Sequence, residues 1–148
     1  MDNYMGNDEY ELMMKQQEVL CRNIAFSLYH GDLRRGGEPT LCHLLRVAES
    51  FDPKDTGYRA PAWLHDAVED GLISIVELQE RGVHKDVLYF VEGLTKPANT
   101  SYEDYIRKMP KDCWPLKAAD LADNLSDQPG KKRAKYIWAL QHMAVHCL

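Results

Sequence analysis

Apolar residues recur at helical spacing along almost the whole chain, and glycine, proline or a capping sequence interrupts them at short intervals. In the first segment Leu12, Val19, Leu20, Ile24 and Leu28 follow this spacing, which is typical of an amphipathic helix. Sustained alternation of apolar and polar residues, the mark of half-buried strands, is nearly absent. The sequence therefore predicts an all-α bundle of seven or eight helices.

Local signals set the expected ends of these helices. Ser74 with Glu77 forms a capping box, and Asp8 with Glu11 and Ser101 with Asp104 resemble one. We expect helices over Asp8–His30, around Leu41–Ala48, over Tyr58–Asp70 and Ser74–Gly82, around Val87–Leu94, and over Ser101–Pro110, Cys113–Leu125 and Lys131–Cys147, with a turn at Gln128-Pro129-Gly130.

Length and composition narrow the functional classes. The chain has 148 residues, of which 45% are hydrophobic, and this predicts one domain with its own core. We expect residues 1–7 to be disordered. A net charge of −5 disfavours a nucleic-acid polymer as partner, and no apolar run is long enough to span a membrane. The acidic N-terminus is not a signal peptide, and the four cysteines are widely spaced. These features predict a cytoplasmic protein with reduced thiols.

The segment Ala62-Trp63-Leu64-His65-Asp66-Ala67-Val68-Glu69-Asp70 is the most informative. On an ideal helix His65, Glu69, Asp66 and Asp70 fall within an arc of about 140°, with the apolar residues opposite. Carboxylates this close repel one another unless a positive charge lies among them, and a divalent metal ion would supply it. A solvated acidic face explains the same pattern equally well.

Two further segments carry polar residues in suggestive order. Lys117, Asp120 and Asn124 share one helix face, although an ordinary amphipathic helix with an ion pair would also show this. Arg34 and Arg35 stand in a glycine-rich loop ahead of His43, where guanidinium groups suit phosphate oxygens. A solvated loop and a core histidine are the simpler explanations when this segment is considered alone.

Taken together, these segments resemble a known family. The order His43, His65-Asp66, Asp120 matches the H…HD…D pattern of HD-domain metal-dependent phosphohydrolases, and most closely the RelA/SpoT-type hydrolase domain that degrades (p)ppGpp. The resemblance rests on RRGGEPTLCHLLRVA, AWLHDAVEDG, VEGLTK, SYEDYI and KAADLADN, which stand in family order.

The resemblance implies a fold, a cofactor and a reaction. It implies an HD-domain helical bundle in which one divalent metal ion, Mn²⁺ by family habit, supports the release of pyrophosphate from the ribose 3′ position of a nucleotide. A second, synthetase domain would not fit in this length, so we expect a hydrolase only. The resemblance assigns its site residues as follows: metal ligands His43, His65, Asp66 and Asp120; catalytic carboxylates Glu69 and Asp70; substrate contacts Arg34, Arg35, Lys117 and Asn124.

Three departures from the family pattern keep alternatives open. Thr40, Leu121 and Asp123 stand where the family has an aromatic residue, a basic residue and His or Tyr, and we expect all three near the substrate pocket. They leave the substrate open to another nucleotide or a phosphorylated cofactor. A non-catalytic nucleotide-sensing or partner-binding module is the alternative from another class.

Two features outside this pattern have plainer explanations. His142, His146 and Cys147 could bind metal by their spacing, but a frayed helix end accounts for them better. The basic run Lys131-Lys132-Arg133 is typical of a solvated helix face. The sequence does not report the oligomeric state.

Overall fold

The computed structural model describes residues 5–127, 130 and 132–147, and within them the chain is all-α, as predicted. No strand occurs among these residues; Leu33 and Pro39 form an isolated antiparallel bridge. The helices are α1 (Asn7–Leu28), α2 (Thr40–Glu49), α3 (Thr56–Ala62), α4 (Ile75–Glu80), α5 (Lys85–Gly93), α6 (Tyr102–Lys108), a short 3₁₀ helix η1 (Lys111–Cys113), α7 (Trp114–Asp127) and α8 (Arg133–His146).

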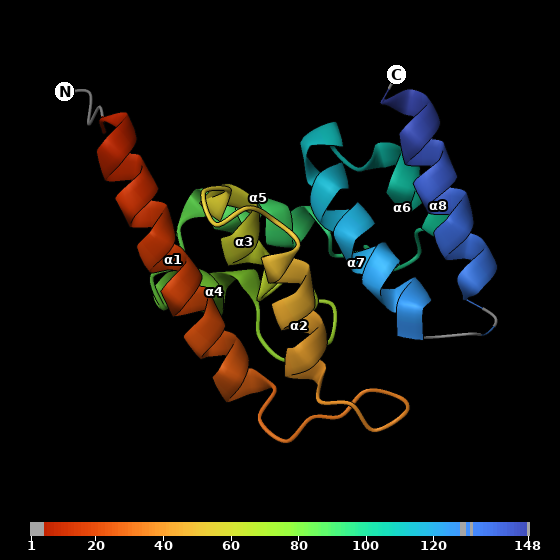
Figure 1. The fold of residues 1–148 in the computed structure, drawn as a ribbon, viewed down its shortest axis with the longest axis horizontal. Helices are drawn as coiled ribbons and strands as arrows, with labels where there is room; N and C mark the ends of the chain where they lie inside the picture. Colours follow the sequence, from red (N-terminus) through yellow and green to blue (C-terminus); the bar gives the residue numbers. More distant parts are fainter. Residues whose placement is uncertain (1–4, 128–129, 131, 148) are drawn as a thin grey trace.

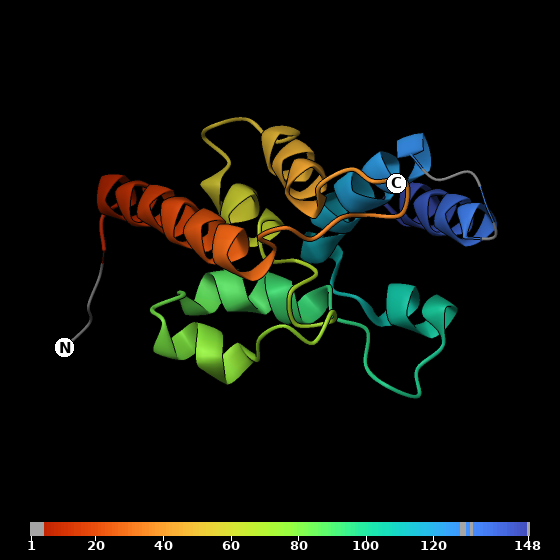
Figure 2. The same ribbon diagram turned by 90° about the horizontal axis from the view of Figure 1, so that it is seen from below.

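The short helix α3 lies at the centre of the bundle (Figures 1 and 2). It packs against α1, α2 and α5, while α4 packs on α5. Helix α7 joins this group to the other side of the molecule, because it contacts α2 on one side and α8 on the other. Helix α6 packs against α8. The loop between α1 and α2 runs past α2 toward the last turns of α7 (Figure 1).

The predicted capping signals are correct at two of three helices. The Ser74 hydroxyl accepts a hydrogen bond from the Glu77 backbone N–H at 3.0 Å, and Ser101 accepts one from Asp104 at 3.1 Å. The predicted box at Asp8 is wrong, because α1 begins at Asn7 behind Gly6, with no side-chain cap. Residues 1–4 of the expected disordered start, the turn residues Gln128 and Pro129, and Lys131 lie outside the described residues.

The predicted apolar stripe of the first helix is partly wrong. Leu12 and Val19 are 58% and 46% exposed. The helix instead buries a stripe made of Met14, Cys21, Ile24 and Ala25. Spacing alone did not separate the two faces, because both carry apolar residues seven positions apart.

The predicted helix over Tyr58–Asp70 is also wrong in its second half. Helix α3 ends at Ala62, and residues 63–71, here called the HD turn, form successive turns. Backbone N–H groups of Leu64 and Ala67 bond three residues back, to Pro61 and Leu64. Apolar periodicity does not distinguish such tight turns from an α-helix, so Leu64 and Ala67 are buried as expected although the helix has ended.

Two other expectations from composition can be compared with the structure. Within the described residues, none of the helices combines the length and apolarity that crossing a bilayer requires. All four cysteines are free thiols. Burial raises the pKa of the Cys21 and Cys113 thiols to about 12.

Gly93 at the end of α5 gives a test of this packing. A Cβ at Gly93 would lie 2.7 Å from the Sγ of fully buried Cys113, so we expect Gly93→Ala to lower the free energy of unfolding by about 1–3 kcal/mol. Adding Cys113→Ala should restore part of this loss by removing the sulfur. Urea denaturation measures both effects.

Gly57 in α3 is the matched control. A Cβ there would meet no atom within 4 Å, so Gly57→Ala should leave stability unchanged or raise it by up to about 1 kcal/mol. Equal stability of the Gly93→Ala and Gly57→Ala variants would contradict the close contact between α5 and η1.

Candidate metal centre and substrate pocket

Four side chains from three segments of the chain converge at one point. His43 comes from α2, His65 and Asp66 come from the HD turn, and Asp120 comes from α7. One ligand atom from each lies within 4.8 Å of the others. Because α3 packs against α2, and α2 against α7, the fold brings together all four residues that the sequence predicted as ligands.

The two imidazole rings face the same carboxylates. Nε2 of His43 lies 3.1 Å from Oδ1 of Asp120 and 3.8 Å from Oδ2 of Asp66. Nε2 of His65 lies 3.1 Å from the same atom of Asp120 and 3.1 Å from Oδ2 of Asp66. His43, His65 and Asp120 are buried, and Asp66 is partly exposed.

The opposite ring nitrogens show why a cation fits this cluster. Nδ1 of His65 lies 2.7 Å from the Ala62 carbonyl oxygen, and Nδ1 of His43 lies 2.6 Å from Oδ2 of Asp123. Both partners only accept hydrogen bonds, so both Nδ1 atoms carry a proton. A neutral ring then directs a lone pair from Nε2 at a carboxylate oxygen, which is favourable only with a cation or a second proton between them. Two imidazoles and two carboxylates are a suitable donor set for a borderline divalent ion.

The pKa shifts within the cluster also show that it favours positive charge. Burial opposes charge on His65, but the carboxylates of Asp66 and Asp120 outweigh it and raise its pKa well above the usual value. Burial likewise disfavours ionised Asp120, but Lys117 and His65 outweigh it and hold its pKa well below the usual range. The buried carboxylate therefore stays ionised and available as a ligand.

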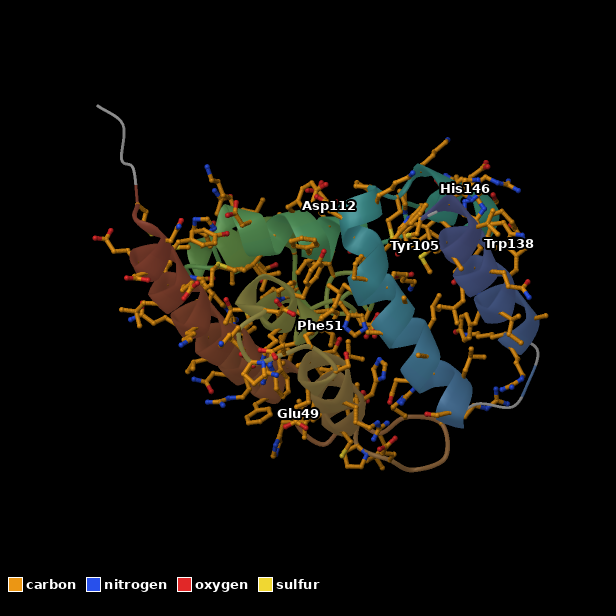
Figure 3. All side chains as sticks on the ribbon, turned by 45° about the horizontal axis from the view of Figure 1, so that its top comes forward. Glu49, Phe51, Tyr105, Asp112, Trp138 and His146 are labelled. Carbon is orange, nitrogen blue, oxygen red and sulfur yellow. The ribbon has the colours of Figure 1, made fainter. Side chains whose placement is uncertain are left out.

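Lys117 supports Asp120 from the side away from the histidines. Its ammonium donates to Oδ2 of Asp120 at 3.0 Å and lies 5.6 Å from the centre of the Tyr105 ring, on α6. Figure 3 shows Tyr105 beside α7. Burial opposes the charge on Lys117, but the carboxylate outweighs it and raises the lysine pKa. Lys117, expected as a substrate contact, is thus a partner of a predicted ligand.

A pocket of about 320 Å³ opens beside the four predicted ligands. It is lined by residues from the loop before α2, α2 itself, the HD turn, α7, the start of α8 and the residue before it, namely Asp32, Leu33, Arg34, Arg35, Thr40, His43, Asp66, Asp70, Asn124, Lys132 and Tyr136. Three of the four predicted substrate contacts, Arg34, Arg35 and Asn124, are in this lining. Lys132 belongs to the basic run that the sequence assigned to a solvated face. The pocket therefore combines cationic groups with two of the predicted ligands.

Arg34 and Asn124 connect the pocket wall to the ligand cluster. Arg34 donates to Oδ1 of Asn124 at 2.8 Å, and the Asn124 amide donates to Oδ1 of Asp120 at 3.3 Å. Arg34 also reaches Oδ2 of Asp123 at 3.4 Å. These bonds hold the loop before α2 against α7.

The two predicted catalytic carboxylates have different neighbours. Asp70 lines the pocket and accepts a hydrogen bond from the Tyr29 hydroxyl at 2.9 Å. Glu69 accepts from the Lys96 backbone N–H and lies near Lys117. Desolvation raises the pKa of both carboxyl groups, and the charge of Asp66 adds to the effect. A carboxylate with a raised pKa is a better proton acceptor.

Of the three departures, one lines the pocket. Thr40 lines the pocket and bonds to Asp32. Leu121 is fully buried in the core and does not line the pocket. Asp123 lies beside the pocket without lining it, because it binds His43 and Arg34, which do line it, and it also binds Arg46. The sequence analysis missed Arg46 and the contact of Asp123 with His43. The signal is the spacing of Arg46 and Asp123, each three positions after a predicted ligand.

The histidines of α8 do not join a second cluster. The rings of His142 and His146 lie 4.1 Å apart, and His142 stacks on Trp138. Figure 3 shows Trp138 and His146 at α8. The guanidinium of Arg107, on α6, lies 5.3 Å from the centre of the Trp138 ring. Within the described part of the chain these histidines belong to no group of three potential metal ligands.

Comparisons with known proteins concern the sequence and the fold. No family model matches the chain. Two sequences named as a GTP diphosphokinase, RSH1, of chloroplasts in Arabidopsis thaliana are 31% identical over 96 residues, which is 64% of this chain and 10% of theirs. The chain thus spans about a tenth of the length of these curated relatives. A solved structure, described as a metazoan ortholog of SpoT that hydrolyzes ppGpp, has a TM-score of 0.65 at 21% identity, over 93% of this chain and 84% of that one.

These findings confirm the resemblance to RelA/SpoT-type hydrolase domains on which the sequence analysis rested. The chain has the same helical HD-domain fold as the solved structure.

The bond between Tyr29 and Asp70 predicts a pH effect that can be measured without substrate. The hydroxyl stabilises the ionised carboxylate, so its removal in Tyr29→Phe should raise the pKa of Asp70 further above its usual value. Carbon NMR titration of labelled aspartates measures this. Tyr89→Phe is the control, because that hydroxyl donates to Asp112 at 2.8 Å outside the pocket. An unchanged or lower pKa of Asp70 in Tyr29→Phe would contradict the bond.

Proposed function

We propose that this chain is a metal-dependent phosphohydrolase that removes the 3′-pyrophosphate of (p)ppGpp. The observation that carries the proposal is the convergence of His43, His65, Asp66 and Asp120 within 4.8 Å beside a pocket lined by Arg34 and other cationic groups. The similarity to a structure described as hydrolyzing ppGpp supports the substrate class.

The four converging residues would hold one divalent ion, for which we propose Mn²⁺. Their mixture of imidazole and carboxylate donors suits such an ion. When bound, the ion supplies Lewis acidity that polarises a phosphoryl oxygen and makes water more acidic. Asn124 and Lys117 hold Asp120 in place for this role.

The chain's own carboxylates would handle the proton of the attacking water. Asp70 lines the pocket, and its raised pKa makes it the better placed of the two to accept that proton. Glu69, near Lys117 and bonded to the Lys96 N–H, orients the water from the other side. The water oxygen forms a bond to phosphorus, the bond from phosphorus to the ribose 3′ oxygen breaks, and that oxygen takes a proton. Pyrophosphate and GDP or GTP are the products.

Cationic side chains would hold the phosphates during this step. Arg35 is exposed at the pocket, and its guanidinium can donate two parallel hydrogen bonds to phosphate oxygens. Lys132, the residue before α8, also lines the pocket. Together they stabilise the negative charge that develops on the phosphoryl oxygens.

One observation favours a second substrate. Thr40 and its partner Asp32 line the pocket, where an aromatic residue follows the Glu-Pro pair in RelA/SpoT-type domains. This change alters the surface offered to the base, so hydrolysis of another nucleotide or a phosphorylated cofactor is the second candidate. A non-catalytic module has no comparable support, because Glu69 and Asp70 both flank the cluster.

A hydrolysis panel tests the proposal. We expect purified protein with Mn²⁺ to convert ppGpp to GDP and pyrophosphate, measured by chromatography of the products. Turnover of a different nucleotide alone would move the assignment to the second candidate. Stoichiometric metal binding without turnover of any substrate would contradict the proposal that the chain is an enzyme.

Single substitutions separate metal binding from catalysis. His65→Ala should lower metal affinity by about 100-fold or more, because it removes a ligand. Glu69→Gln should retain the metal and lower kcat by about 100-fold, because the neutral amide replaces the carboxylate that orients the attacking water. Calorimetry and steady-state kinetics measure the two effects. Glu80→Gln, an exposed change on α4, is the control, and full activity of Glu69→Gln would contradict the role of Glu69.

A further inference from the structure

The outer nitrogen of His43 has a charged partner that no motif predicts. Nδ1 of His43 lies 2.6 Å from Oδ2 of Asp123, on α7. The corresponding nitrogen of His65 faces only a backbone carbonyl, that of Ala62. The two histidines of the cluster are therefore oriented differently, one by a neutral acceptor and one by a carboxylate.

Asp123 is itself fixed by Arg46. Nε of Arg46 donates to Oδ1 of Asp123 at 2.6 Å, and one terminal nitrogen donates to Oδ2 at 3.1 Å. The guanidinium is held in turn by both oxygens of Glu38. Such a two-point contact fixes the plane of the carboxylate as well as its position.

The helices α2 and α7 contribute these groups in matching pairs. His43 and Arg46 are three residues apart on α2, and Asp120 and Asp123 are three residues apart on α7. Residues three apart share a helix face, so the face of α7 that offers Asp120 to Nε2 of His43 also offers Asp123 to Nδ1. Arg46, one turn after His43 on α2, binds the same Asp123 carboxylate.

We propose that Asp123, held by Arg46, is a positioning residue of the metal centre, which fixes His43 as the Nδ1–H tautomer with Nε2 directed at the cluster. The inference rests on the proposed function, since it assigns a partner to one of the four ligands. A carboxylate behind a ligating histidine orients the ring and makes the ligating nitrogen more basic. Asp123 acts through His43, and it does not line the pocket.

Metal affinity tests the proposal without any substrate. Titration of the whole metal-free chain with Zn²⁺ and with Mn²⁺ should show about 10-fold weaker binding in Asp123→Asn. Arg46→Gln should weaken binding by a smaller factor, because the carboxylate remains. Asp86→Asn is the matched control, since Asp86 accepts from the Tyr10 hydroxyl at 2.6 Å away from the cluster, and its affinity should be unchanged.

Proton NMR of the Zn²⁺-loaded protein supplies a readout that a general loss of structure would not mimic. We expect a strongly downfield Nδ1–H resonance of His43, which moves upfield in Asp123→Asn while the melting temperature stays close to that of the parent. Equal affinity of parent and Asp123→Asn, or no such resonance in the parent, would overturn the role of Asp123 and leave the metal site intact. Failure of the parent to bind either ion would instead overturn the proposed function and the inference with it.

Discussion

The pairing of imidazole nitrogens with carboxylate oxygens inside the bundle is the constraint on which the site depends. Asp120 is buried and meets two ring nitrogens at 3.1 Å through a single oxygen. A buried carboxylate is costly unless charged or hydrogen-bonded partners surround it, and here Lys117 and Asn124 supply those partners. The central place of α3 brings the HD turn to the same point as α2 and α7. The polar cluster therefore lies where these three segments pack together.

Most of the helices could be predicted because their ends are set by local signals. Ser74 and Ser101 cap their helices in the way the sequence indicates. The errors arise where tertiary packing decides. The exposure of Leu12 and Val19 depends on which face of α1 meets α3, and the end of α3 at Ala62 depends on the tight turns that carry His65 and Asp66 inward.

The convergence of His43, His65, Asp66 and Asp120 was predictable because the resemblance rests on residue identities in order along the chain. The contact of Asp123 with His43 was not predictable in this way, because the family pattern marks Asp123 only as a departure. Its role depends on the crossing of α2 and α7, which places two residues from each helix in register across the contact. A single sequence does not specify which helices pack together. The spacing of three residues on α2 and on α7 therefore predicts no contact until the two helices are known to touch. Leu121 follows Asp120 in the sequence, yet it is buried in the core. Being next to a predicted ligand in the sequence therefore does not place a residue in the pocket lining.

The same carboxylate links the ligand side of the site to the pocket side. Oδ2 of Asp123 accepts hydrogen bonds from His43 and Arg34, and Oδ1 accepts one from Arg46. Arg34 belongs to the loop that lines the pocket. The position of that loop and the orientation of His43 therefore depend on one group. A ring at this position, as in RelA/SpoT-type domains, cannot accept two guanidinium groups at once, because it lacks two anionic oxygens. In this chain the pocket wall and the ligand cluster are thus fixed together by one ionic network.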